Sequence, residues 1–287
     1  MAISHHNKEN NVPSALLKFS NNMAASSVIT LVEGNTLKLK LEGINKANRL
    51  QAKVDLTNIV TVSDTQHNAR ADSWHFEFEA KQAGMARISI GCQNGPALLI
   101  SPPAITINVE AAIALPPTNT EPGMLVRLLL AESPSPQRMG DTSAADVKKG
   151  MQWMRRVIVN RLNSDKPEEF MARGAQSVSD IITADDRGSV QFHGFNRYPN
   201  LETEIMKNIS ESLAIANNGT HPKRAAYAQF LQSAIDVANE ALTPDPTPTG
   251  LFAWRTKKAA SPGAEFKLFG MAAGNDFYTH TRLKKKD

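Results

Sequence analysis

The sequence predicts a multi-domain chain whose two domains differ in fold class, an antiparallel β-sandwich followed by a mainly α-helical domain. Its 287 residues exceed the roughly 100–200 residues of one typical domain, so two domains are expected. Apolar residues alternate with polar ones through residues 28–110, as in strands, and recur every three or four positions after residue 123, as in helices. Proline and small polar residues over 111–122 predict a linker between the two domains.

The first part of the chain divides into a leader and a sandwich. Residues 1–27 are polar, rich in Asn and Ser and without a sustained period, so they are expected to form a flexible leader or a loosely packed first strand. Short alternating runs such as Thr36–Leu41 and Ile105–Val109 then follow, separated by Gly, Asn and Pro. Residues 28–110 resemble an immunoglobulin-like sandwich in size and pattern. Because Cys92 is the single cysteine, the chain cannot form the Cys–Trp–Cys core of true immunoglobulin domains, and only the architecture is predicted. The sandwich is expected to serve as a docking or binding module.

Residues 123–287 carry the helical period. An apolar run predicts a short helix that Pro134 ends, and a second helix is expected from its cap at Ser143 to Leu162. After a proline-rich break over 244–250, the chain is expected to be irregular and to end in a basic tail.

Composition and charge narrow the classes of function. The net charge of +4 suits an anionic polymer, but aromatic residues are only 6% of the chain and are not interleaved with basic ones, which argues against nucleic-acid binding. No apolar stretch approaches the roughly 20 residues that span a bilayer, so membrane insertion is not expected. One cysteine and seven scattered histidines give neither a disulfide framework nor a compact zinc pattern. The sequence therefore predicts no metal and no cofactor.

A carboxylate at the end of an apolar helix is the first candidate for chemistry. Glu132 follows the run Leu128–Ala131, so its carboxyl group is expected near packed apolar surface. Desolvation raises the pKa of a carboxyl group and makes it usable as a general acid near neutral pH. From the residue alone, the alternative is an ordinary glutamate at a helix end, where the helix dipole disfavours its charge.

The order of short motifs after Glu132 resembles one known family. The motifs are Asn160-Arg161, Ser179–Ile182, Gln191-Phe192, Asp245–Gly250 and Asn275–Tyr278. Over about residues 123–279 the chain resembles the cell wall hydrolase family of spore-cortex-lytic, germination-type enzymes. The resemblance implies a lysozyme-like fold and cleavage of peptidoglycan glycan strands, typically as a lytic transglycosylase. The chain departs from the family motif at Ser133–Pro136, which replaces Ala-Arg-Gly-Glu, and inserts residues 137–145.

The resemblance implies roles for individual residues. It places the catalytic acid on Glu132, which would protonate the glycosidic oxygen between N-acetylmuramic acid and N-acetylglucosamine. Asn160 and Arg161 would support the site through a hydrogen bond to the Glu132 loop. The candidates for substrate binding are Gln191, which could hold a sugar amide, and Phe192, Trp254 and Tyr278, each of which could instead be a core residue. The candidates for a second carboxylate are Asp141, Asp185 and Asp186, so hydrolysis and formation of an anhydro product both stay open.

The expected function is cleavage of peptidoglycan by a lytic transglycosylase or muramidase. Because no secretory signal is visible, the chain is expected to be made in the bacterial cytoplasm and exported by a signal-independent system such as type VI secretion. It would then act as an antibacterial effector in the periplasm of a target cell. Its partners would be a secretion-spike component, bound by the sandwich, and a periplasmic immunity protein. The alternatives are a non-catalytic protein with a degenerate lysozyme fold that binds peptidoglycan or a partner, and a phage-type endolysin.

Overall fold

The computed structural model describes residues 14–93, 98–186 and 189–284, which fall into two compact units. The first unit holds the described residues up to Ala112 together with Asn217–His221, and the second holds the rest. Part of the predicted leader, including His5 and His6, and the end of the basic tail lie outside the described residues.

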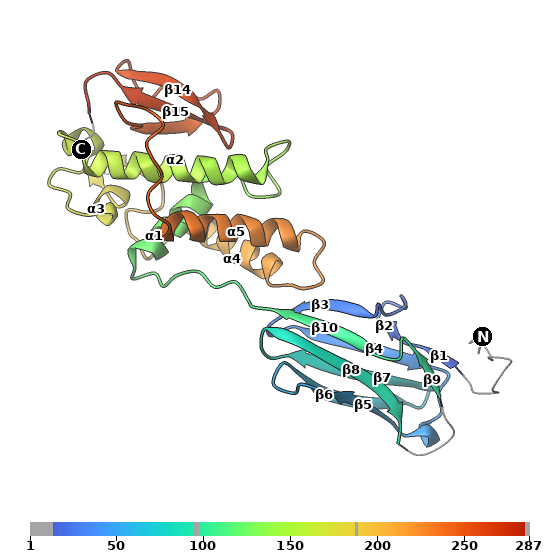
Figure 1. Cartoon of the computed structure of the whole chain (residues 1–287). Coiled ribbons are helices and arrows are strands. Elements are labelled where there is room, and N and C mark those ends of the chain that lie inside the picture. The colour runs from blue at the N-terminus through green and yellow to red at the C-terminus, as the bar shows by residue number, and fades with distance from the viewer. Residues whose placement is uncertain (1–13, 94–97, 187–188, 285–287) are drawn as a thin grey trace. The chain divides into compact units, whose positions relative to one another are not determined.

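Two four-stranded sheets form the first unit (Figure 1). One sheet has the order β3 (Val28–Val32), β10 (Ile105–Glu110), β8 (Gly84–Cys92) and β5 (Leu50–Val54). The other has the order β2 (Lys18–Phe19), β4 (Thr36–Glu42), β7 (Ser73–Ala80) and β6 (Val60–Asn68). A separate pair joins β1 (Ser14–Leu16) to β9 (Leu99–Ser101), and the short helix η1 (Lys46–Asn48) follows β4. Because β3 pairs with β10, and β1 with β9, in parallel, the strands are not purely antiparallel as predicted.

A shared core holds the two sheets together. Leu37, Leu39 and Leu41 of β4 are buried, and the register places Leu39 opposite Phe76 of β7. These side chains belong to one apolar cluster with Ile107 of the other sheet. Polar residues alternate with them along β4 and face the other way, which is why the alternating pattern predicts strands here.

Helices and a small sheet form layers in the second unit (Figure 1). α2 (Ala144–Leu162) contacts both α5 (Arg224–Asn239) and β14 (Phe266–Ala272), so it lies between the helices and the sheet. The sheet is antiparallel, with β15 (Asn275–His280) between β13 (Ala253–Thr256) and β14. The remaining elements are α1 (Glu121–Glu132), η2 (Pro167–Phe170), α3 (Val178–Ile182), β11 (Asp185–Asp186), β12 (Ser189–Val190) and α4 (Thr203–Ala216).

The predicted fold class, with a mainly α-helical, lysozyme-like domain over residues 123–287, is wrong. The described residues hold fifteen strands against five α-helices, and β11 to β15 lie in the second unit. The error has a physical cause in the sheet. β14 exposes Leu268, Phe269 and Met271, so its sequence lacks the alternation of buried and exposed residues that indicates a strand. Without that signal, the pattern predicts only an irregular end.

A cap and close packing fix the start of α1. The hydroxyl oxygen of Thr120 accepts a hydrogen bond from the Gly123 backbone N–H at 3.1 Å. Arg127 donates to the Pro116 carbonyl oxygen at 2.9 Å, which ties the segment before the helix to the helix itself. A Cβ atom on Gly123 would collide with the Pro117 carbonyl oxygen. Glycine is therefore required where the incoming chain crosses the first turn of α1.

Gly123→Ala is expected to destabilise the second unit by about 1–3 kcal/mol, because the new methyl group overpacks against the Pro117 carbonyl. Differential scanning calorimetry measures the change as a fall in the Tm of this unit. Gly263→Ala is the matched control, because a Cβ at Gly263 would meet only Phe266, at an ordinary distance of 3.6 Å. Equal Tm values for the two variants would contradict the packing argument.

Candidate functional site

Glu132 lies at the C-terminal end of α1, and the burial of this helix fixes its position. Leu128 and Leu129 are almost fully buried in the core of the second unit. The backbone N–H of Ser133 donates to the Leu129 carbonyl oxygen at 3.1 Å and closes the helix. The partly buried Glu132 carboxyl group accepts a hydrogen bond from Trp254 Nε1 at 3.1 Å. A helix end and a strand therefore hold the carboxyl group from two sides.

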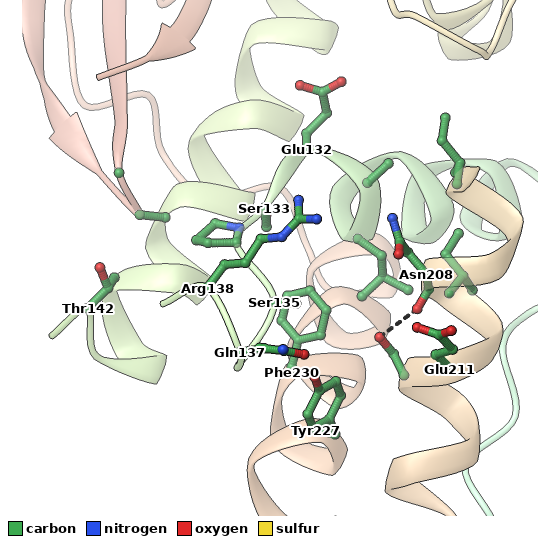
Figure 2. Close-up of a pocket in the computed structure, with 18 of the residues that line it drawn as sticks. Glu132, Ser133, Ser135, Gln137, Arg138, Thr142, Asn208, Glu211, Tyr227 and Phe230 are labelled. Carbon is green, nitrogen blue, oxygen red and sulfur yellow. Dashed lines mark hydrogen bonds between the residues drawn. The ribbon is translucent and has the colours of Figure 1, made fainter. Parts of the chain in front are cut away.

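Two cavities of the second unit meet at Glu132. The first has a volume of about 480 Å³ and the second a volume of about 600 Å³. The residues that line both are Ala131, Glu132, Thr256 and Asn275. In the first cavity, the Glu132 carboxyl points away from Tyr227 and Phe230 (Figure 2). Its partner Trp254 lines the second cavity, so the carboxyl group lies where the two cavities meet.

The environment of Glu132 favours its protonated form. Burial raises the pKa of the carboxyl group above its ordinary value. The hydrogen bond from Trp254 opposes this rise in pKa, as do the positive charges of Arg161 and His193, by smaller amounts. A carboxyl group that keeps its proton toward neutral pH can act as a general acid.

Arg161 is held beside this carboxyl group in a buried position. Its Nε donates to the Phe252 carbonyl oxygen at 2.8 Å, and its Nη1 donates to Gln191 Oε1 at 2.7 Å. Its guanidinium carbon lies 4.8 Å from the ring centre of Phe170, within the range of a cation–π contact. Burial, together with the positive charge of the neighbouring Arg255, lowers the pKa of Arg161 to about 9.

Asn160 holds the loop that leads into β13. Its Nδ2 donates to Asp245 Oδ2 at 2.6 Å and to the Leu251 carbonyl oxygen at 2.9 Å. Asp245 Oδ1 in turn accepts from the Thr247 backbone N–H at 3.0 Å. Asn160 and Arg161 thus bond to residues 245–252 and to Gln191, and not to the Glu132 loop for which the resemblance implied a contact.

The candidate binding residues separate into two groups. Gln191, Phe192 and Trp254 line the second cavity, and the Phe192 and Trp254 rings stack with centroids 5.2 Å apart. Tyr278 is buried in β15 and lines neither cavity. Asn275, three residues earlier on the same strand, is one of the four residues that line both cavities. It opens the Asn275–Tyr278 motif quoted from the sequence, but no role was predicted for it.

The acidic candidates for a second carboxylate lie elsewhere. Asp141, Asp185 and Asp186 are exposed and line neither cavity. Two glutamates that the sequence analysis did not name line the cavities instead, Glu169 in the second and Glu211 in the first. Both are exposed, and nothing in the local sequence distinguishes them from solvated helix residues.

Two further searches of the described residues bear on the chemistry. No group of three His, Cys, Asp or Glu side chains in residues 14–93, 98–186 and 189–284 could hold a metal ion. Within the same ranges, no helix is both long and apolar enough to cross a bilayer.

The sequence matches no protein-family model and no curated protein. Among solved structures, it is similar to the S-layer protein SbsC, with 13% identity and a TM-score of 0.24 over 32% of this chain and 13% of that one. It is also similar to the Lin-41 filamin domain, with 13% identity and a TM-score of 0.24 over 30% of this chain and 87% of that one. For InvD of Yersinia pseudotuberculosis the identity is 11% and the TM-score 0.24, over 37% and 30% of the two chains. The chain thus spans a small part of SbsC, and likeness at this level bears on neither activity nor partners.

The resemblance to the spore-cortex-lytic cell wall hydrolases is wrong, and no family model supports it. The immunoglobulin-like resemblance concerned only a β-sandwich architecture, and the first unit has two four-stranded sheets with one shared core. The second unit carries a three-stranded antiparallel sheet that a mainly helical lysozyme-like domain was not expected to have. The quoted motifs are short and individually unspecific, which is why their order misled the assignment.

Glu132→Gln is expected to stabilise the protein at neutral pH. The folded carboxyl group binds its proton more tightly than the unfolded one, so stability falls as the pH rises from the unfolded pKa through the folded pKa. Glutamine has no charge to desolvate and keeps an oxygen that can accept from Trp254. The gain in the free energy of unfolding is about 1.4 kcal/mol for each tenfold difference in proton affinity between the folded and the unfolded carboxyl group. Urea unfolding at neutral pH and at about pH 4, near the pKa of an unfolded glutamate, measures the difference.

The gain should shrink at the acidic pH, where the carboxyl group of the unfolded wild-type protein is also protonated in a large part of the molecules. Glu204→Gln is the matched control, because Glu204 is exposed on α4 and lines neither cavity. A gain for Glu132→Gln that is the same at both pH values would contradict the desolvation argument.

Proposed function

We propose that the second unit is a glycosidase that cleaves peptidoglycan glycan strands with Glu132 as its general acid. One observation carries the proposal: a carboxyl group with a raised pKa lies where two cavities meet. Sugar units on the two sides of a scissile bond would occupy the two cavities. The proposal rests on this site and not on a lysozyme-like fold.

The reaction begins with proton transfer from Glu132 to the glycosidic oxygen. The bond between that oxygen and C1 breaks, the leaving sugar departs with the proton, and C1 becomes oxocarbenium-like. The Glu132 carboxylate then accepts a proton from the hydroxyl group that attacks C1. If the attacking group is the 6-hydroxyl of the same sugar, one carboxylate serves both steps and the product is a 1,6-anhydro sugar. Attack by water gives a reducing end, and Glu169 is the other acidic residue of the second cavity.

The side chains near Glu132 suit an N-acetylated, acidic glycan. Gln191 and Asn275 bring amide groups to the cavity walls, which can bond to acetamido groups of the sugars. Arg161 and Arg255 bring positive charge to the same cavity. Peptidoglycan combines acetamido groups with carboxylates, and the net charge of +4 favours approach to such a polymer.

Glu132→Gln is expected to lower the rate of cleavage of purified sacculi by about a hundredfold or more, because it removes the proton donor while conserving the shape of the side chain. Mass spectrometry of the released muropeptides measures the products. Ends with 1,6-anhydro-muramic acid from the wild-type protein would support the one-carboxylate mechanism, and reducing ends would assign the attack to water.

The matched control is Glu204→Gln, which removes an exposed carboxylate of α4 outside both cavities and should cleave as fast as the wild type. Binding of the wild-type protein to sacculi without any cleavage would overturn the enzymatic proposal in favour of a binding protein.

Trp254→Phe is expected to shift the alkaline limb of the pH profile of kcat/KM to higher pH. The indole N–H stabilises the Glu132 carboxylate, so its removal raises the pKa of the acid further. Phenylalanine retains a ring to stack on Phe192. Trp153→Phe is the control, because Trp153 packs on Phe277 and lines neither cavity. The pH dependence of cleavage by the three proteins measures the shift, and a limb that stays in place would refute the role of this hydrogen bond.

A further inference from the structure

Arg161 is a buried cation with no carboxylate of the described residues in direct contact, although the charge of Glu132 across the cavity raises its pKa. It is only 8% exposed, and no carboxylate oxygen of the described residues lies within 4.0 Å of its guanidinium nitrogens. Its two hydrogen bonds go to neutral acceptors, the Phe252 carbonyl oxygen and Gln191 Oε1. Nη2 makes no hydrogen bond in the described part of the chain.

This arrangement costs free energy in the empty site. A buried charge is ordinarily paired or coordinated, because desolvation of an ion is expensive. The rings of Phe170, Phe192 and Trp254, at 4.8, 5.6 and 5.9 Å from the guanidinium carbon, offset part of this cost through cation–π contacts. With a pKa of about 9, the side chain still carries its charge at neutral pH.

The unused donor is available to a ligand. Arg161 lines the second cavity, and Nη2 is not among the fully enclosed polar atoms that lack a hydrogen-bond partner. The side chain cannot turn away easily, because Nε and Nη1 are both engaged with the surrounding chain. A guanidinium group held in this way presents a fixed N–H donor to the cavity, a geometry that suits a carboxylate.

We propose that Arg161, with Arg255 at the cavity rim, binds a carboxylate group of the glycan in the second cavity, next to Glu132. This inference rests on the proposed function and names the substrate group that the site selects. The carboxylate could be the lactyl group of a muramic acid that carries no peptide stem, or a carboxylate of the stem itself. The acidic residues that face the cavity are Glu132, whose burial raises its pKa and so favours the uncharged form, and Glu169, which is exposed and screened by water.

Binding measured without cleavage tests the inference. Glu132→Gln protein is titrated by isothermal calorimetry with stem-free glycan strands, whose lactyl carboxylates are free. The second probe is the same strands after carbodiimide coupling to methylamine, which neutralises the carboxylates, and the third is stem-bearing strands. We expect neutralisation of the stem-free strands to weaken binding about tenfold or more, as for loss of a charge-assisted hydrogen bond. If coupling weakens the binding of the stem-bearing strands only, the bound carboxylate belongs to the stem.

Two double variants identify the arginine. Arg161→Gln in the Glu132→Gln background should bind charged and neutralised strands equally, whereas Lys149→Gln in that background should keep the preference. Lys149→Gln is the matched control, because it also removes one positive charge from α2 and Lys149 lines neither cavity. Arg161→Lys keeps the positive charge but loses the planar set of N–H donors of the guanidinium group. It should retain only part of the preference for charged strands. If Arg161→Gln fails to fold, as judged by circular dichroism, Arg161→Lys and the comparison of charged with neutralised strands still test the carboxylate site.

The outcomes separate this inference from the proposed function. Equal binding of charged and neutralised strands of both kinds by Glu132→Gln protein, or no binding, overturns the carboxylate site even if the wild-type protein cleaves sacculi. A carboxylate preference that Arg161→Gln abolishes supports the site even if the wild-type protein cleaves nothing, in which case only the proposed function fails.

Discussion

The position of the Glu132 carboxyl group depends on the burial of α1, and the remaining features of the site follow from it. Leu128 and Leu129 anchor the last turn of the helix in the core, which fixes the backbone from which the Glu132 side chain extends. Its hydrogen bond reaches across to Trp254 on β13. The core of the unit and the geometry of the site are therefore set by the same packing contacts.

Asn160 and Arg161 fulfil a second structural requirement from adjacent positions on α2. Asn160 ties down the loop before β13 through Asp245 and the Leu251 carbonyl oxygen, and Arg161 bonds to the next carbonyl along, that of Phe252. Together they fix the strand that carries Trp254. Loss of either contact would be felt at Glu132 through the movement of this strand, without any direct contact to the carboxyl group.

The sequence predicted some of these features for physical reasons and missed others. Alternation predicted the strands of the first unit because Leu37, Leu39 and Leu41 face one shared core. The apolar run before Glu132 predicted the helix that ends there. The fold class of the second unit was wrong because β14 has exposed apolar residues and no alternation. No role was predicted for Asn275 because a residue that lines two cavities is defined by contacts across the fold, which no local pattern records.

Glu132 and Arg161 are coupled through the second cavity. In the empty site the charge of Arg161 lowers the pKa of Glu132, and the charge of Glu132 raises the pKa of Arg161. A substrate carboxylate on Arg161 would neutralise the first of these effects and place a negative charge near the acid. Both changes raise the pKa of Glu132. On the proposed mechanism, binding of the acidic sugar would thus favour the protonated acid at the moment when a glycosidic oxygen is present to receive its proton.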